Sequence, residues 1–171
     1  LFLQYMNNLS NYDIIIIGAR VAGSTLAAIL GKKGYNVLML DRATFPSDTL
    51  STHLFRAPAF RAFDQIGVCS EVQSVAPQLR VNYNVIDGIE FPEPVDRPDD
   101  YPFYMCVRRI VLDDILIRHI KQISNVELRE GVKVSGLIWN KDIVTGVKWE
   151  KADEKGESTA KVIVGAEDRK R

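Results

Sequence analysis

The start of the chain carries an apolar run, a small-residue segment and a second apolar run, in that order. The first run, Asp13–Ile17, is rich in isoleucine and predicts a buried β-strand. The segment from about Val21 to Lys33 predicts a helix that ends at Gly34. The second run, about Asn36–Asp41, predicts a strand that pairs in parallel with the first. This order predicts a strand–helix–strand unit and an α/β fold.

Later patterns predict further elements with less regular spacing. We expect a helix at about Pro58–Ile66, one strand over residues 80–91, and a strand that begins at Phe103 and runs into a helix. That second helix has a face of mostly apolar residues at helical spacing, namely Leu112, Ile115, Leu116, His119, Ile120 and Ile123. Residues 42–53 and 92–102 predict loops, because prolines and small polar residues gather there.

The C-terminal part, about Val126–Val164, predicts several strands in a β-meander laid over the nucleotide site. Turns are expected at Asn140–Lys141 and around Gly156. We expect Trp139 and Trp149, which fall in these strands, to pack in the fold rather than act as stacking platforms.

The junction between the first strand and the first helix contains the most informative residues. Gly18 allows the chain to turn sharply, and Gly23 allows the helix to lie close to the sheet. The helix N-terminus favours a pyrophosphate, and Asp41 can accept hydrogen bonds from ribose hydroxyls. Arg20 replaces the middle glycine of the pattern, so its side chain must point away from the pyrophosphate or pair with it. The sequence therefore predicts a Rossmann-type dinucleotide site.

Composition narrows the class of protein. Lys and Arg total 22, as do Asp and Glu, so nothing suggests a nucleic-acid partner. No apolar run reaches the roughly 18 residues of a membrane span. We expect the two cysteines, Cys69 and Cys106, to be buried and unpaired, which fits a reducing, cytoplasmic compartment. The residues show no metal-ligand spacing and no Ser-His-Asp or Cys-His arrangement, so no catalytic residue is assigned.

Four motifs in order resemble the N-terminal part of FAD-dependent oxidoreductases, in particular the p-hydroxybenzoate hydroxylase-like aromatic hydroxylases (group A flavoprotein monooxygenases). The motifs are the glycine turn, the segment Phe45–Leu54, the Arg109-Ile-Val-Leu-Asp113 stretch and Val162–Arg169. The resemblance implies a Rossmann-like FAD-binding domain over residues 12–171. That domain would follow a flexible tail, 1–11, and be truncated before the substrate-binding sheet.

The resemblance also implies roles for individual residues. Gly18, Val21, Ala22 and Gly23 would line the FAD pyrophosphate, and Asp41 would hold the adenosine ribose with Arg42 beside it. A loop of Ser51, Thr52 and His53 would approach the flavin. Arg109 would contact the ribityl-phosphate region, the Val134 backbone would meet the adenine, and Glu167-Asp168 would replace the family's Asp-Gly pair. The full set of cofactor-binding residues is then Gly18, Arg20, Val21, Ala22, Gly23, Asp41, Arg42, Thr52, His53, Arg109, Val134, Glu167 and Asp168.

Ordinary structural roles are the alternatives to these assignments. Arg109 could be a surface arginine beside Arg108, and His53 an exposed loop residue. Asp113 and Asp114 would sit in a first helical turn and interact with its dipole. His119 would be half-buried on the apolar face.

The function that the resemblance implies is NAD(P)H-dependent monooxygenation. NAD(P)H would reduce FAD, and the reduced flavin would use O2 to hydroxylate a small organic substrate. A flavin reductase of the geranylgeranyl type, a NAD-dependent dehydrogenase and a non-catalytic remnant stay open as alternatives. The substrate, the choice among hydroxylation, reduction and halogenation, the choice between NADH and NADPH, and the oligomeric state stay open too.

Overall fold

The computed structural model describes residues 12–49, 54–94 and 101–167, so the predicted tail lies outside the described residues. The chain forms two compact units. The first combines residues up to Ser47 with residues from Leu116 onward, and the second runs from Asp48 to Ile115.

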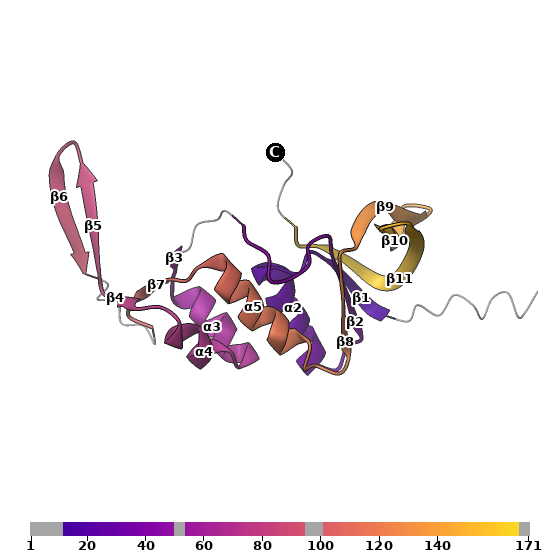
Figure 1. Ribbon diagram of the computed structural model, residues 1–171, viewed down its shortest axis with the longest axis horizontal. Helices are drawn as coiled ribbons and strands as arrows, with labels where there is room; N and C mark the ends of the chain where they lie inside the picture. Colours follow the sequence, from indigo (N-terminus) through magenta and orange to yellow (C-terminus); the bar gives the residue numbers. More distant parts are fainter. Residues whose placement is uncertain (1–11, 50–53, 95–100, 168–171) are drawn as a thin grey trace, which may run out of the picture. The chain divides into compact units, whose positions relative to one another are not determined.

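The first unit is built on a six-stranded sheet with the strand order β8-β2-β1-β11-β10-β9 (Figure 1). Its elements are β1 (Tyr12–Ile17), α2 (Val21–Lys32), β2 (Val37–Asp41), β8 (Val126–Glu130), β9 (Lys133–Asn140), β10 (Ile143–Lys151) and β11 (Glu154–Gly165). Strands β8, β2, β1 and β11 pair in parallel. The strand–helix–strand unit and the α/β class predicted from the sequence are confirmed.

Both faces of the parallel strands are covered, which explains why β1 and β2 read as continuous apolar runs. On the α2 side the buried helix residues are small: Gly23, Ser24, Ala27, Ala28 and Gly31. Small residues let the helix backbone approach the strands closely. The opposite face carries a core cluster made of Ile15, Ile17, Leu38, Leu40, Val132, Val147 and Ala160. Valines from the C-terminal part therefore pack on the first two strands.

The meander reaches this face because β11 is long. Its first half pairs antiparallel with β10, and its second half pairs in parallel with β1. The predicted meander is confirmed for β9, β10 and β11, with a turn at Lys141, whose φ is 54°. It is wrong for β8, which pairs in parallel with β2. The turn predicted around Gly156 is wrong, because the chain reverses at Ala152 (φ 50°) and Gly156 lies within β11. A Cβ at Gly156 would lie 2.4 Å from the Trp149 ring, so this glycine makes room for an indole.

The two tryptophans of the meander differ. Trp149 is half-buried, and its Nε1 donates a hydrogen bond to Ser158 Oγ at 3.0 Å, so the predicted packing role is confirmed. Trp139 is 59% exposed, and the same prediction is wrong for it.

Tyr12 links β1 to β8 across the sheet, beyond the intervening strand. Its hydroxyl donates to Glu127 Oε2 and accepts from Arg129 Nη2 at 3.1 Å, while Arg129 Nε donates to Glu127 Oε1 at 2.7 Å. Burial alone would raise the pKa of Glu127, but the hydrogen bonds from Tyr12 and Arg129 outweigh it and lower that pKa below its ordinary value of 4.5.

We expect Tyr12→Phe to lower the free energy of unfolding by about 0.5–1 kcal/mol at pH 7, since the lost hydrogen bond is partly exposed. Glu127 stabilises the fold above pH 4.5, and that contribution is lost as the pH falls through its lower folded-state pKa. The difference between the two proteins should therefore shrink in acid. Urea unfolding at several pH values measures this, with Tyr83→Phe on an exposed strand as the control. Equal stability of wild type and Tyr12→Phe at pH 7 would contradict the expectation.

The second unit contains short strands and two small helices. Its elements are β3 (Leu54–Phe55), α3 (Ala57–Ile66), α4 (Cys69–Ser74), β4 (Gln78–Leu79), β5 (Val81–Ile86), β6 (Ile89–Pro94), β7 (Tyr104–Cys106) and the first part of α5 (Arg109–Ile120). Strands β3, β7 and β4 form one sheet, and β5 and β6 form a separate hairpin. The predicted helix at about Pro58–Ile66 is confirmed as α3, and Gly67, in the left-handed conformation, caps its C-terminus.

The single strand predicted over residues 80–91 is wrong. The chain reverses at Asp87 and Gly88, which both have positive φ, and this separates β5 from β6. An Asp-Gly pair between alternating apolar residues is a strong indication of a hairpin, so the sequence did contain the sign. The predicted loop over residues 92–102 also begins too early, because β6 extends to Pro94.

The cysteines are both free thiols, and their burial differs. Cys69 is buried as predicted, whereas Cys106 is exposed, so the prediction of burial is wrong for Cys106. Cys106 is the last residue of the three-residue strand β7, and the two residues before it occupy the buried positions.

Candidate dinucleotide-binding site

The turn between β1 and α2 requires both of its glycines. Gly18 has a φ of +103°, which side-chain-bearing residues rarely adopt, and a Cβ there would lie 2.9 Å from the Ala166 backbone. A Cβ at Gly23 would lie 1.9 Å from the carbonyl oxygen of Gly18. The turn is anchored on the sheet, because the Gly18 N–H donates to Leu40 O at 2.8 Å and the Ala166 N–H to Ile17 O at 2.7 Å.

The N-terminus of α2 has the character of an anion-binding site. Its N-cap residue, Arg20, makes no side-chain capping hydrogen bond, and the first turn holds no acidic residue. Helix geometry leaves the first N–H groups without intrahelical acceptors, and the helix dipole adds a partial positive charge. These N–H groups suit a phosphate.

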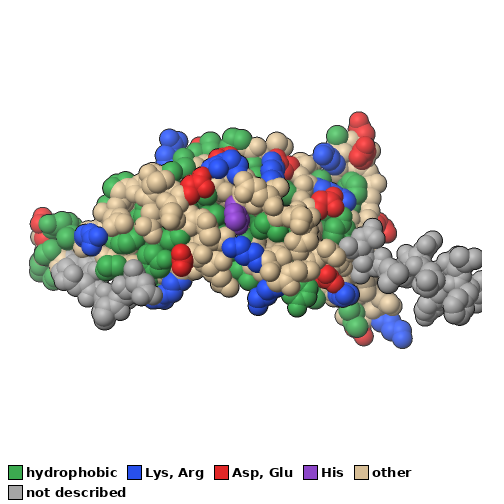
Figure 2. Space-filling model, turned by 90° about the horizontal axis from the view of Figure 1, so that it is seen from below, with side chains coloured by type: hydrophobic (Ala, Val, Ile, Leu, Met, Phe, Trp, Pro, Cys, Tyr) green, Lys and Arg blue, Asp and Glu red, His purple; other side chains and the backbone are tan. Residues whose placement is uncertain are grey.

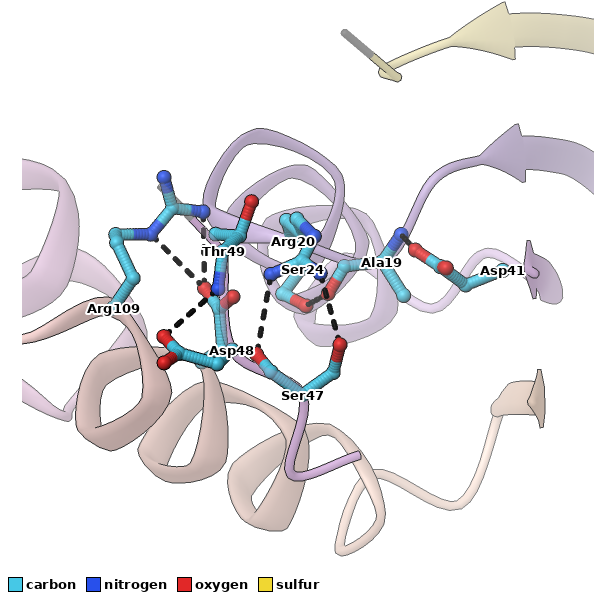
Figure 3. Close-up of polar contacts among 9 residues, drawn as sticks. Ala19, Arg20, Ser24, Asp41, Ser47, Asp48, Thr49 and Arg109 are labelled. Carbon is cyan, nitrogen blue, oxygen red and sulfur yellow. Dashed lines mark hydrogen bonds and ion pairs between the residues drawn. The ribbon is translucent and has the colours of Figure 1, made fainter. Parts of the chain in front are cut away.

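Asp41 ends β2 beside the glycine turn and is buried (Figure 3). Its Oδ2 accepts a hydrogen bond from the Ala19 N–H at 2.6 Å, and its Oδ1 accepts one from the Ala43 N–H at 2.7 Å. A carboxylate can accept about four hydrogen bonds, so it can still receive ribose hydroxyls. The turn amide thus holds the acid in a fixed orientation.

Arg20 extends toward the segment that follows β2. Its Nη2 lies 3.1 Å from Ser47 Oγ, and its Nη1 lies 3.5 Å from the Ser47 carbonyl oxygen (Figure 3). Its guanidinium carbon lies 5.6 Å from the centre of the Phe45 ring. In the structure the Arg20 side chain contacts protein groups, and its predicted role at the pyrophosphate stays a prediction.

The remaining predicted residues of the first unit occupy different environments. Val21 is half-buried and Ala22 exposed in the first turn of α2, and Arg42 is exposed directly after Asp41. Val134 packs against the core cluster from β9, and Glu167 is exposed just beyond β11. Thr52, His53 and Asp168 lie outside the described residues, as does Ser51, and the roles assigned to all of these residues stay predictions.

Arg109 belongs to the second unit, where it opens α5. Its Nη2 and Nε lie 3.1 and 3.3 Å from Asp113 Oδ1. The Arg109 side chain is 12% exposed and that of Asp113 is fully buried, so the alternative of a simple surface arginine is wrong. The predicted first-turn position of Asp113 and Asp114 is also wrong, because α5 already begins at Arg109 and its first turn holds no acidic residue.

Several residues of the site were not found from the sequence. Ser24 Oγ donates a hydrogen bond to the Ala19 carbonyl oxygen at 2.6 Å, and Ser47 receives the Arg20 guanidinium. Ser47 lies in the Phe45–Leu54 motif, but no role was assigned to it, and a serine inside a helix, such as Ser24, has no pattern that marks it as part of a site. His119, on α5, is half-buried as predicted.

Other kinds of site find little support in the part of the chain that the structure describes. No group of three His, Cys, Asp or Glu side chains there could hold a metal ion. None of its helices is long and apolar enough to cross a membrane. On the face shown in Figure 2, acidic and basic side chains are interspersed.

The parallel strands, the two required glycines and the buried acid at the end of β2 define a Rossmann-type dinucleotide-binding domain. More specifically, the chain belongs to the FAD binding domain family, whose model matches residues 11–170. This confirms the family expected from the sequence.

Individual relatives agree with this assignment. The FAD-dependent monooxygenase prhF of Penicillium brasilianum is 30% identical over 155 residues, which cover 80% of this chain and 33% of that protein. The solved p-nitrophenol 4-monooxygenase PnpA of Pseudomonas putida shares the fold, with a TM-score of 0.80 at 19% identity over 90% of this chain and 40% of its own. The myxobacterial chondrochloren halogenase CndH has a TM-score of 0.80 at 25% identity, covering 91% of this chain and 37% of its own.

The chain spans 17% to 33% of the length of the first curated relatives that it matches. The shared region is therefore the FAD-binding part of larger flavoproteins.

Proposed function

We propose that this chain holds FAD at the turn between β1 and α2, and that it is the cofactor-binding part of an NAD(P)H-dependent monooxygenase. The observation that carries the proposal is the turn itself, where Gly18 and Gly23 bring the N-terminus of α2 next to the carboxylate of Asp41. The membership of the chain in the FAD binding domain family supports the choice of FAD over NAD.

Different residues of the first unit bind different parts of FAD. The first N–H groups of α2 bind the pyrophosphate, and Asp41 accepts hydrogen bonds from the adenosine ribose with Arg42 beside it. The Val134 backbone meets the adenine, and Glu167 borders the site after β11. In the second unit, Arg109 contacts the ribityl-phosphate region, and its pairing with Asp113 holds the guanidinium in one orientation.

FAD supplies the redox chemistry when it is bound, and the protein supplies orientation and electrostatics. In the whole protein, NAD(P)H, a proton, O2 and an organic substrate R–H would give NAD(P)⁺, R–OH and water. The name of the relative prhF supports monooxygenation. A reducing, cytoplasmic compartment belongs to the proposal, supported by the free thiols of Cys69 and Cys106.

Halogenation is the second candidate, because the halogenase CndH is similar at 25% identity. The two functions differ in what they require besides NAD(P)H and O2. A hydroxylase consumes O2 productively with its organic substrate alone, whereas a halogenase also requires a halide. A flavin reductase of the geranylgeranyl type would oxidise NAD(P)H with its substrate in the absence of O2. Product analysis of the longer protein with and without halide and O2 separates the three.

The first test is the visible absorption spectrum of the purified chain titrated with FAD. We expect the flavin absorption bands to co-elute with the protein. We also expect ADP to compete with FAD, because the turn and Asp41 would bind the ADP half of FAD. We expect no NAD(P)H oxidation above that of free FAD, since the chain covers about a third of prhF. A protein that melts cooperatively yet ignores FAD would show that the binding proposal is wrong. Turnover of NAD(P)H by the chain would contradict the second expectation.

A further inference from the structure

The segment after β2, residues 42–47, is fastened at both ends to residues of the dinucleotide site. Near its start, the Ala43 N–H donates to Asp41 Oδ1 at 2.7 Å. At its end, the Arg20 guanidinium donates to Ser47 Oγ at 3.1 Å and approaches the Ser47 carbonyl oxygen at 3.5 Å (Figure 3). The segment therefore runs between the acid at the end of β2 and the N-cap residue of α2.

The middle of the segment is held by the end of β8. The Phe45 N–H donates to Glu130 Oε2 at 3.1 Å, and the Gly131 N–H donates to the Ala43 carbonyl oxygen at 3.0 Å. These contacts fix the first four residues of the segment. Its last residue, Ser47, accepts a hydrogen bond from Arg20, the N-cap residue of α2.

Arg20 stands where the dinucleotide pattern has its middle glycine, the residue that allows a close approach of the pyrophosphate. Its side chain is directed to Ser47 and to the Phe45 ring, at 5.6 Å from the ring centre. An arginine whose guanidinium group contacts both a hydroxyl and an aromatic ring has a defined orientation before a ligand binds.

We propose that Arg20 is a positioning residue that acts through Ser47. It holds the end of segment 42–47 at the N-terminus of α2, so the segment is already ordered before the cofactor binds. Binding then carries no entropic cost of ordering the segment, and the affinity for FAD is higher for that reason. Arg20 is not the ligand of the pyrophosphate, which stays with the N–H groups of α2. This inference rests on the proposed function, that FAD binds at this turn.

The test combines Arg20→Gly, Ser47→Ala and the double variant. Glycine is an acceptable N-cap residue, so Arg20→Gly should leave α2 intact. We expect each single variant to raise the Kd for FAD about fivefold, as for the loss of one immobilised side chain. We expect the double variant to be no weaker than Arg20→Gly, because both changes break the same contact.

Hydrogen exchange of the FAD-free proteins provides a second readout. Deuterium uptake over residues 42–47 should rise in both single variants, while the melting temperature stays within about 2 °C of wild type. Arg20→Lys keeps a charged donor for Ser47 and should recover part of the protection and of the affinity. Ser70→Ala, at an exposed serine of α4, is the matched control and should change neither quantity.

Two results would overturn the inference. If Arg20→Gly binds FAD as tightly as wild type or more tightly, the side chain does not position the site. If Arg20→Gly weakens binding but Ser47→Ala does not, Arg20 acts on the phosphates directly. Both results can be distinguished from failure of the wild-type chain to bind FAD, which would contradict the proposed function itself.

Discussion

Gly23→Ala is expected to abolish FAD binding and to lower the melting temperature by about 10 °C. The added methyl group would lie 1.9 Å from the Gly18 carbonyl oxygen, and the backbone carbonyl cannot move as a flexible side chain would. Helix α2 must therefore shift away from β1, which we expect to cost about 3 kcal/mol or more. The same shift displaces the N–H groups that we propose as the pyrophosphate ligands, so affinity should fall beyond the loss of stability.

The matched control is Gly136→Ala in β9, where an added Cβ meets nothing within 4 Å. This variant should melt like the wild type and bind FAD equally well. Thermal melting followed by circular dichroism and titration with FAD measure both effects. A Gly23→Ala protein that binds FAD like the wild type would mean that α2 does not need its close approach to the sheet.

Asp41→Asn is expected to weaken FAD binding about 30-fold, which corresponds to about 2 kcal/mol. Asp41 accepts backbone N–H groups on both oxygens, at 2.6 and 2.7 Å. An asparagine can accept only one of them, because its amide nitrogen would face the other N–H as a second donor. The side chain would rotate or leave one buried N–H unsatisfied, and the charged acceptor for the ribose hydroxyls would be lost. We expect a further destabilisation of about 1–3 kcal/mol in the free protein.

Asp64→Asn, at an exposed position of α3, is the control that removes the same charge elsewhere. It should change neither the Kd for FAD nor the free energy of unfolding measured in urea. If Asp41→Asn bound FAD with wild-type affinity, the acid would serve only to brace the glycine turn, and its ribose role would be wrong. Competition with ADP shows whether the loss falls on the ADP half.

The turn, the helix and the acid of the candidate site could be predicted from the sequence because their determinants are local, whereas the binding roles of these residues stay predictions. The turn between β1 and α2, the helix and Asp41 all fall within about 30 residues, and the chemistry of each residue type is set by its own backbone and charge. The strand β1 could be predicted for the same reason. A run of isoleucines indicates a strand that is buried on both faces, whichever elements cover those faces. The hairpin β5–β6 was also local, and Asp87-Gly88 could have identified it.

What the sequence could not determine depends on contacts between distant residues. The direction of the Arg20 side chain depends on Ser47 and Phe45, and nothing in the glycine pattern indicates either. The place of Gly156 opposite Trp149, rather than in a turn, depends on the register between β10 and β11. The sequence by itself thus determined the class of site, because short-range backbone geometry and residue chemistry define it. Only the tertiary structure decided which partners orient its side chains, because those partners come from strands and loops far away along the chain.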